Sequence, residues 1–534
     1  MVEVLPLPAP PEGREPLNEA TKTWVEEAIW GHRLRKDQEP WQILLEFLNL
    51  CHAASTKGGV SLLDHPEIAT DPPRHEQFGY GLPVREVLRY IIFRDRHVTA
   101  IQNSADFATD QSRWQAWREA VTNDLARKGI THDHLLQLER NFQGNFVNFA
   151  HAVQLLRAME IEPERGRRWT SRHLTPHGPA LFYADVKESS GKGYSNDRRF
   201  FARGGELLYL MLHRSRGIDV LRPLIAGKLL ADGSRWNTLA GLFQPLEMVE
   251  RPIHSHSLGY LPAAQHRTYD RLADDWIALL SIKKLPIDHL FDPLVRITGL
   301  GIVRYLLDRA QDQLQLRRPH PLLLDFTGGR ARGMRKASAE QHHIARHLTT
   351  RALEAFIFER LAGATDPAWP APGATSGQDR SEAQTVLRTL FLHEQNYPSG
   401  LPAPEQQLAD FKEYVLAKHE AHLGLVQGIF AQKIGLATTR QGVGTWYAAS
   451  DSFVQALLLA NVETTMELRV LLDTLYRRYA IVIAAAQARD AFDTLPLPVE
   501  RLNENERQFE QRLKALGLLK RLSDDCAFVA NPFN

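Results

Sequence analysis

Apolar residues recur at helical spacing along most of the chain. In the first third they predict helices over Asn18–Asn49 (divided at Pro40), Val84–Phe93, Trp114–Ala126 and Phe142–Met159. We therefore expect a helical N-terminal domain over residues 18–160. Before it, proline interrupts each apolar stretch of residues 1–17, which predicts a flexible leader rather than a signal peptide.

The pattern becomes mixed over residues 161–362. Prolines and glycines separate short apolar runs, of which Ala180–Ala184 is the best strand candidate. Glu206–Leu212 is strongly apolar and predicts a buried helix, and Leu294–Leu316 predicts a long amphipathic helix. Pro321–Phe326 resembles a short buried strand that leads through a glycine-rich turn into another helix. This pattern predicts a mixed, mostly helical middle domain with basic loops.

A change of composition marks the next boundary. Residues 363–381 are rich in Pro, Gly, Ala, Thr and Ser without periodicity, which predicts a linker. The remaining residues, 382–534, predict a C-terminal helical domain. Inside it, Ile434–Ala448 is typical of a hairpin, and Ser452–Ala460 and Met466–Arg478 are typical of apolar helices.

The end of the chain has the clearest pattern. Asn503 is a candidate cap for a helix that Gly517 ends. Leu518–Leu522 and Cys526–Val529 then predict a hairpin. Helix, glycine and two-stranded wing is the order found in winged-helix modules. The predicted fold class is mainly α: a multidomain helical protein with small β elements and a winged-helix-like C-terminal module.

The bulk composition narrows the possible partners. Sixty-four Lys and Arg stand against 63 Asp and Glu, so the formal net charge is +1 and any electrostatic partner must meet a local patch. Cys51 and Cys526 lie near opposite ends, which excludes a disulfide framework and favours a reducing, cytoplasmic compartment. No stretch approaches the roughly 18 apolar residues of a membrane-spanning helix, so we expect no membrane partner.

Four basic residues follow the strand candidate that ends at Phe326: Arg330, Arg332, Arg335 and Lys336. A phosphate-binding loop for nucleotide hydrolysis does not fit, because Met334 and Arg335 stand where Lys and Ser or Thr are required. Two interpretations remain. The cations bind phosphates of nucleic acid, or they form a solvated turn whose arginines pair with carboxylates elsewhere.

A second basic region contains Arg165, Arg167 and Arg168. Aromatic residues such as Trp169 and Tyr183 are interleaved with its cations, and on an open surface they can stack on bases. The alternative is that these aromatics belong to the core.

Asp185 and Lys187 have the local form of a restriction-type nuclease core, in which the carboxylate holds a divalent metal and the lysine assists the attacking water. That fold also requires an acidic residue upstream on a neighbouring strand. The nearest acids, Glu160, Glu162 and Glu164, lie in or just after an apparent helix. The alternative is a strand end with surface charges.

Glu340, His343 and His347 share one face of a predicted helix and are a candidate metal site. The zinc-protease pattern does not fit, since Ile344 stands where it requires a glutamate. An exposed histidine-rich face is the alternative. No complete catalytic motif and no cofactor are expected from the sequence.

Three stretches are similar to proteins of multigene bacterial anti-phage defence operons, particularly large accessory subunits of methylation-associated or phosphorothioate-linked systems. They are Ile29–Asn49, Asp197–Leu212 and Thr445–Tyr479. The resemblance implies a cytoplasmic bacterial subunit beside an ATPase, methyltransferase or nuclease encoded nearby. The function expected from the sequence is a non-enzymatic scaffold that binds partner proteins and DNA, and the alternative is a metal-dependent nuclease.

Overall fold

The computed structural model describes most of the chain but not all of it. The described residues are 25–31, 34–56, 63, 76–77, 91, 95–126, 132–157, 160–161, 170–171, 186–189, 193–196, 204–231, 233–243, 257–259, 261–328, 331–365, 368–521 and 527–534. Within them the protein is mainly helical with small β elements, as the sequence predicts.

Besides a helical segment over residues 25–30, the helices are α2 (Pro40–Thr56), α4 (His97–Asn103), α5 (Asp110–Ala126), α6 (His132–Asn141), α7 (Phe146–Arg157), α8 (Gly204–His213), α9 (Ile218–Lys228), α10 (Arg235–Gly241), α11 (Arg267–Ser281), α12 (Ile287–Gln313), α13 (Arg332–Ala362), α14 (Gly377–Phe391), α15 (Pro404–Ala421), α16 (Leu423–Lys433), α17 (Asp451–Asn461), α18 (Leu468–Tyr479), α19 (Ala485–Ala491) and α20 (Val499–Ala515). None of the helices in the described ranges combines the length and apolar content needed to cross a bilayer.

The strands are short: β1 (Glu76–Gln77), β2 (Glu160–Ile161), β3 (Thr170–Ser171), β4 (Val186–Ser189), β5 (Gly193–Asn196), β6 (Ser257–Gly259), β7 (Leu322–Leu323), β8 (Ala437–Arg440), β9 (Gly444–Tyr447), β10 (Thr465–Glu467), β11 (Ile481–Val482), β12 (Leu519–Arg521) and β13 (Ala527–Ala530). Most form two-stranded antiparallel pairs, whereas β7 and β11 pair in parallel.

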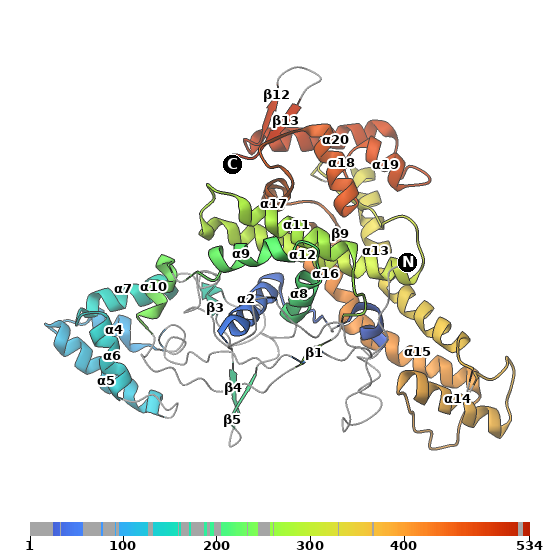
Figure 1. The fold of residues 1–534 in the computed structure, drawn as a ribbon, viewed down its shortest axis with the longest axis horizontal. Helices are drawn as coiled ribbons and strands as arrows, with labels where there is room; N and C mark the ends of the chain where they lie inside the picture. Colours follow the sequence, from blue (N-terminus) through green and yellow to red (C-terminus); the bar gives the residue numbers. More distant parts are fainter. Residues whose placement is uncertain are drawn as a thin grey trace.

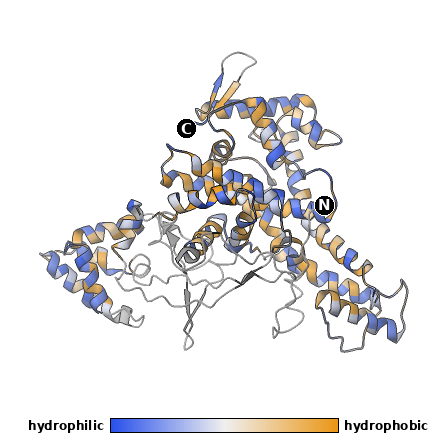
Figure 2. Cartoon of the chain, viewed as in Figure 1, coloured by the Kyte–Doolittle hydropathy of each residue, from blue (hydrophilic) through white to orange (hydrophobic). Residues whose placement is uncertain are grey.

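One hydrophobic core includes residues from Val25 to Val529. Helix α12 lies at its centre, where it packs against α11, α13, α16 and α17 (Figure 1). Residues 297–311 of α12 are all buried, so this part of the helix is enclosed on every side. The prediction of an amphipathic helix with an exposed face is therefore wrong. Figure 2 shows hydrophobic residues gathered in the middle of the molecule, while peripheral helices alternate between hydrophobic and hydrophilic positions.

Helices α2 and α8 approach closely because glycines begin α8. The backbone N–H of Gly204 donates to Gln38 Oε1 at 3.0 Å, and that of Gly205 donates to Glu46 Oε2 at 2.8 Å. The Glu46 carboxylate therefore meets two favourable features of a helix N-terminus, unpaired N–H groups and the positive end of the dipole. The predicted buried helix over Glu206–Leu212 is confirmed.

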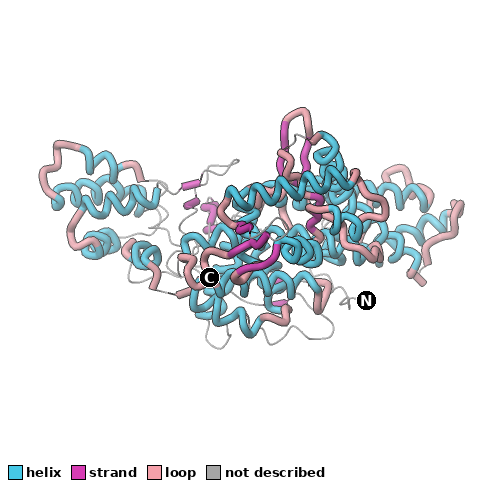
Figure 3. Tube along the Cα trace, turned by 90° about the horizontal axis from the view of Figure 1, so that it is seen from above, coloured by secondary structure: helices cyan, strands magenta, loops and turns pink. Residues whose placement is uncertain are grey.

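Helices α4 to α7 form a separate lobe with its own aromatic core. Trp114 and Trp117 of α5 pack on Phe146 and Phe149 of α7, and Phe243 completes the cluster. Figures 1 and 3 place this lobe at one end of the molecule and α14 with α15 at the other. Residues of α2 belong to the main core, whereas residues of α4 to α7 belong to this second cluster.

The predicted linker contains the start of a helix. Helix α14 begins at Gly377 because Ser376 and Asp379 form a capping box, each side chain bonding the backbone N–H of the other residue.

The elements of the C-terminal part follow in the order α17, β10, α18, β11, α19, α20, β12 and β13. Strands β10, β12 and β13 form one antiparallel sheet in the order β10-β13-β12. Both predicted hairpins, at β8–β9 and at β12–β13, are confirmed. Placing Asn503 as a helix cap is wrong, because α20 begins at Val499 after Pro498 and Asn503 lies inside the helix.

Candidate nucleic-acid interface

The predicted basic turn lies at the start of α13. Arg332 is the first residue of the helix and Lys336 follows one turn later, and both are exposed. Arg335 is partly buried, with its guanidinium 6.0 Å from the centroid of the Trp446 ring. Arg330 lies outside the described residues. The structure therefore brings two of the four predicted cations to one exposed helix face.

These cations do not stabilise their own helix. The first turn of α13 contains no acidic residue. The N-cap residue is Ala331, whose methyl side chain cannot cap the helix with a hydrogen bond. Cations at a helix N-terminus oppose the helix dipole by roughly 0.3–1 kcal/mol each. An anion bound here would offset that cost.

The start of α13 packs against the C-terminal part of the chain. Met334 and Ala337 share a small core with Leu502 of α20 and Ala488 of α19. A Cβ added to Gly333 would lie 3.3 Å from Leu497 Cδ2. Arg332 and Lys336 therefore lie beside the segment that leads into α20.

Helix α20 has a buried face and an exposed face. Its buried residues are Leu502, Asn505, Phe509 and Leu513. Asn505 fixes the helix to the parallel strand pair: its Nδ2 donates to the carbonyl oxygens of Leu324 and Ile483 at 2.9 Å, and its Oδ1 accepts from Phe326 N at 2.7 Å. Exposed residues on the other side include Asn503, Arg507, Gln511 and Lys514.

Two carboxylates beside this exposed face, Glu504 and Glu510, contact nearby cations. Glu504 pairs with Arg501 at 3.0 Å, and Glu510 lies 3.6 Å from Arg521 of β12. Glu506 is half-buried, and burial raises the pKa of its carboxyl against the opposing effect of Arg469.

His343 and His347 are both exposed on α13, and their Nε2 atoms are 3.1 Å apart. Glu340 is also exposed. The part of the chain that the structure describes contains no group of three or more His, Cys, Asp or Glu side chains that could hold a metal ion. The two histidines thus meet each other without a third ligand from these residue types.

The remaining sequence candidates fall largely on residues that the structure leaves undescribed. Arg165, Arg167, Arg168 and Asp185 lie outside the described residues. The backbone of Lys187 lies in β4, opposite Ser195 of β5. The nuclease and the second basic region therefore stay predictions.

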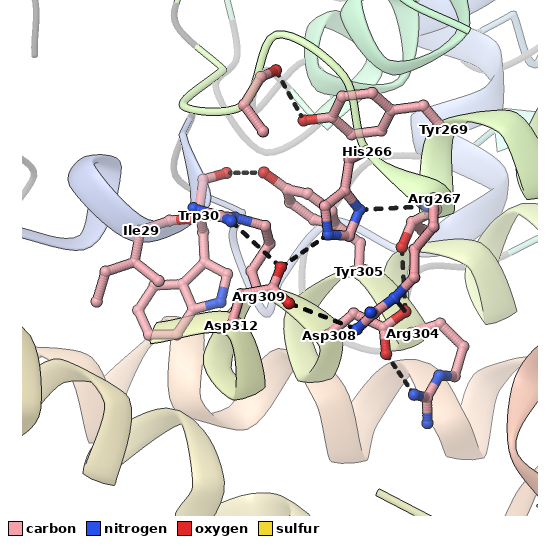
Figure 4. A network of polar contacts seen from close by, with 12 residues as sticks. Ile29, Trp30, His266, Arg267, Tyr269, Arg304, Tyr305, Asp308, Arg309 and Asp312 are labelled. Atoms are coloured by element: carbon pink, nitrogen blue, oxygen red, sulfur yellow. Dashed lines mark hydrogen bonds and ion pairs between the residues drawn. The ribbon is translucent and has the colours of Figure 1, made fainter. Parts of the chain in front are cut away.

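A cluster of charged side chains with a buried centre joins α11 to α12 (Figure 4). Asp308 lies at its centre, paired with Arg304 on its own helix and with Arg271 of α11 at 3.1 Å. Burial alone would raise the pKa of Asp308, but Arg304, Arg271 and Arg267 outweigh it and hold that pKa well below its usual range. Asp308 is therefore ionised at all ordinary pH values.

His266 extends this network and begins α11. Its Nδ1 accepts the backbone N–H of Thr268 at 3.2 Å, and its Nε2–H donates to Asp312 Oδ2 at 2.9 Å. Because Nδ1 is an acceptor, the ring is neutral. Burial lowers the pKa of His266 against the opposing effect of Asp312.

The network fastens the first described helix to the core. Arg309 Nε donates to the Ile29 carbonyl oxygen at 2.9 Å, and the Tyr305 hydroxyl donates to that of Trp30 at 2.9 Å. Helix α11 also contacts α18: Asp275 of α11 accepts hydrogen bonds from Arg478 and Tyr479 of α18. These contacts satisfy carbonyls and carboxylates inside the protein, so the cluster positions helices rather than presenting groups to a substrate.

Sequence patterns did not single out this network. Arg304 and Asp308 are spaced like an exposed ion pair on an amphipathic helix. The apolar residues around them could have indicated that the pair is buried. Apolar side chains lie on several sides of the helix here, so it has no wide polar face: Ile302, Val303, Leu306 and Leu307.

No protein-family model matches the chain, and a search of curated proteins finds no match.

Proposed function

We propose that the protein is a non-enzymatic scaffold subunit that binds duplex DNA through a winged-helix-like C-terminal module. The observation that supports this most is the order of its elements. Helix α17, strand β10 and helix α18 are followed by α20 and the β12–β13 hairpin, with β11 and α19 inserted between α18 and α20. Apart from this insertion the order resembles that of winged-helix modules, and the three strands form a sheet in the order β10-β13-β12. In such modules the helix before the wing meets the DNA, and here that helix is α20.

Local charge supports DNA as the ligand. Arg332 and Lys336 are exposed at the start of α13, next to the segment that leads into α20. With a formal net charge of +1, the whole chain exerts little attraction on a polyanion. Binding would therefore depend on this patch and on α20.

The scaffold part of the proposal rests on the resemblance to accessory subunits of bacterial anti-phage defence systems. Its partners would be an ATPase, methyltransferase or nuclease encoded nearby, in the cytoplasm. Co-expression with the products of adjoining genes, followed by affinity purification, tests this. A stable complex is expected, and its absence for all of them contradicts the scaffold role.

A gel-shift titration of the full chain against a duplex at increasing salt tests DNA binding. We expect binding at low salt that weakens as salt rises, because cations displaced from phosphates are released on binding. Replacing Arg332 and Lys336 by alanine should weaken binding and reduce the salt slope by about one for each phosphate that is no longer neutralised.

The matched control replaces Arg360 and Arg388, two exposed arginines at the end of α13 and on α14. This variant removes the same charge away from the patch and should bind like the wild type. Equal losses of affinity in both double variants would show that total charge matters and the patch does not. No shift even at low salt overturns the proposed function.

A further inference from the structure

We propose that His343 and His347 of α13 together bind one divalent transition metal ion, Zn²⁺ or Cu²⁺, through their two Nε2 atoms. The inference goes beyond the proposed function and does not depend on it, because it concerns a metal chelate and not contacts with DNA. Glu340, the third residue of the sequence-based candidate, is not needed as a ligand. Within the described residues it completes no group of three His, Cys, Asp or Glu side chains that could hold a metal.

Helix α13 holds the two histidines as neighbours. They lie four positions apart, so their side chains emerge from one face, one turn apart. The helix runs from Arg332 to Ala362, which places both residues well away from ends that fray. Its opposite face is anchored in the main core by Ala345 and Leu348. The backbone under the pair is therefore fixed, and a metal ion has only the two side chains to order.

The separation of the ring nitrogens fits a chelate. The two Nε2 atoms are 3.1 Å apart, and the rings are inclined at 57° with centroids 4.4 Å apart. Two Zn–N bonds of about 2.05 Å place their nitrogens about 3.3 Å apart at the tetrahedral angle and about 2.9 Å apart at a right angle. The observed distance lies between these values. Without a metal, the same approach lets one ring donate a hydrogen bond to the other, and metal binding would release that proton.

The ligand atoms determine which metals fit. Imidazole nitrogens suit Zn²⁺, Cu²⁺ and Ni²⁺, whereas Mg²⁺ and Ca²⁺ take oxygen ligands. Lys336, Arg346 and Arg351 are also exposed on α13, and their charges repel any dication. Affinity must therefore come from coordination and not from a general attraction of cations.

The site would be open and not closed. Both histidines are exposed, so water reaches the remaining coordination positions of a bound ion. A structural zinc site, by contrast, fills all four positions with protein ligands. A metal held here would be exchangeable and accessible to a further ligand.

The test titrates the full-length protein with Zn²⁺ by isothermal calorimetry. We expect one site that His343→Ala and His347→Ala each weaken by roughly 100-fold, because a lone imidazole loses the second ligand that the helix supplies at high effective concentration. The double variant should bind no more weakly than either single variant. One equivalent of Cu²⁺ reports the ligands directly: its electron paramagnetic resonance spectrum should show coupling to two imidazole rings in the wild type and to one in each single variant.

The matched control replaces His151 of α7 and His289 of α12 by alanine. Both are exposed but they do not form a pair, so this variant removes two imidazoles and should keep the affinity for Zn²⁺. Thermal melting without metal checks that each variant folds.

Three results would overturn the metal site: affinity retained in the His343 and His347 variants, the same loss in the control variant, or displacement of Zn²⁺ by equimolar Mg²⁺. Each of them leaves the proposed function standing, since the gel shift tests DNA binding separately.

Discussion

Arg304 and Asp308 form an ion pair one turn apart on α12, and each side chain is only 1% exposed. Charges removed from water to this extent require several partners, and Asp308 has three: Arg304, Arg271 and Arg267. The pair lies where the first described helix, α11 and α12 meet, so it affects how the core is assembled.

Replacing Asp308 by asparagine should destabilise the protein by about 3–5 kcal/mol, because it removes the carboxylate that the buried Arg304 and Arg271 share. Urea unfolding followed by circular dichroism measures the change. Asp493→Asn is the control, since Asp493 is 93% exposed in its pair with Arg318. An exposed pair contributes about 0–1 kcal/mol. Equal losses in the free energy of unfolding for the two variants would contradict a larger contribution to stability from the buried network than from an exposed ion pair.

Two asparagines of α20 should respond differently to replacement by alanine. Asn505→Ala removes three buried hydrogen bonds and leaves two carbonyls and an N–H without a partner. We expect a loss of about 2–4 kcal/mol in the free energy of unfolding. Asn503→Ala should change it by less than about 0.5 kcal/mol, because Asn503 is exposed. A similar loss at both positions contradicts the assigned orientation of α20.

Glycine-to-alanine changes in α8 and α9 should have opposite signs. A Cβ at Gly205 would meet Glu46 Cβ at 2.5 Å and Phe47 N at 2.6 Å, so Gly205→Ala forces α8 away from α2. A loss of about 1–3 kcal/mol is expected from such overpacking. Gly227 has nothing within 4 Å of an added Cβ, and Gly227→Ala should stabilise α9 by about 0.5–1 kcal/mol. Thermal melting compares the two, and a stabilising Gly205→Ala would show that α2 and α8 are farther apart.

Buried histidines should make stability depend on pH. Burial lowers the pKa of both His320 and His342 to about 4. In the unfolded chain the pKa is about 6.5, so the unfolded state binds more protons between these values. Their stabilising contribution is complete above about pH 6.5 and is lost as pH falls toward 4, at about 1.4 kcal/mol per pH unit for each histidine.

His320→Gln tests the contribution of one ring. The glutamine amide can replace the bond from His320 Nε2 to the Gln341 carbonyl oxygen, which is 3.0 Å long, but it does not titrate. Urea midpoints measured from pH 7 to pH 4.5 should fall less steeply in this variant. Parallel slopes for the variant and the wild type would contradict a neutral, buried His320.

Local signals in the sequence located most helices and both C-terminal hairpins. Helix α8 was predictable because the apolar run Leu207–Leu212 follows Glu206, and the β12–β13 hairpin because Gly517 separates it from an amphipathic helix. Strand β10 was not, since Thr465–Glu467 becomes a strand only by pairing with β13, which lies far along the chain. The same holds for the parallel pair of β7 and β11.

The sequence shows where cationic residues lie along the chain, but it does not show how exposed each one is in the fold. Arg332, Arg335 and Lys336 look equivalent along the chain, but contact with Trp446 partly buries Arg335. Asn503 has the residue type of a helix cap, and the exposed position it occupies depends on where Asn505 is bonded. Such distinctions depend on tertiary contacts, which periodicity does not record.

The hydrogen bond between Glu26 and His419, 3.1 Å long, joins residues 393 positions apart. Ribosomes add about 5–20 residues per second, so Glu26 is synthesised roughly 20 to 80 seconds before its partner His419. Trp30 is likewise synthesised long before its hydrogen-bond partners, Tyr305 and Leu306. The apolar face of the first helix is therefore exposed throughout most of translation. A nascent-chain chaperone that covers it during that interval would raise the yield of folded protein more than one that acts after release.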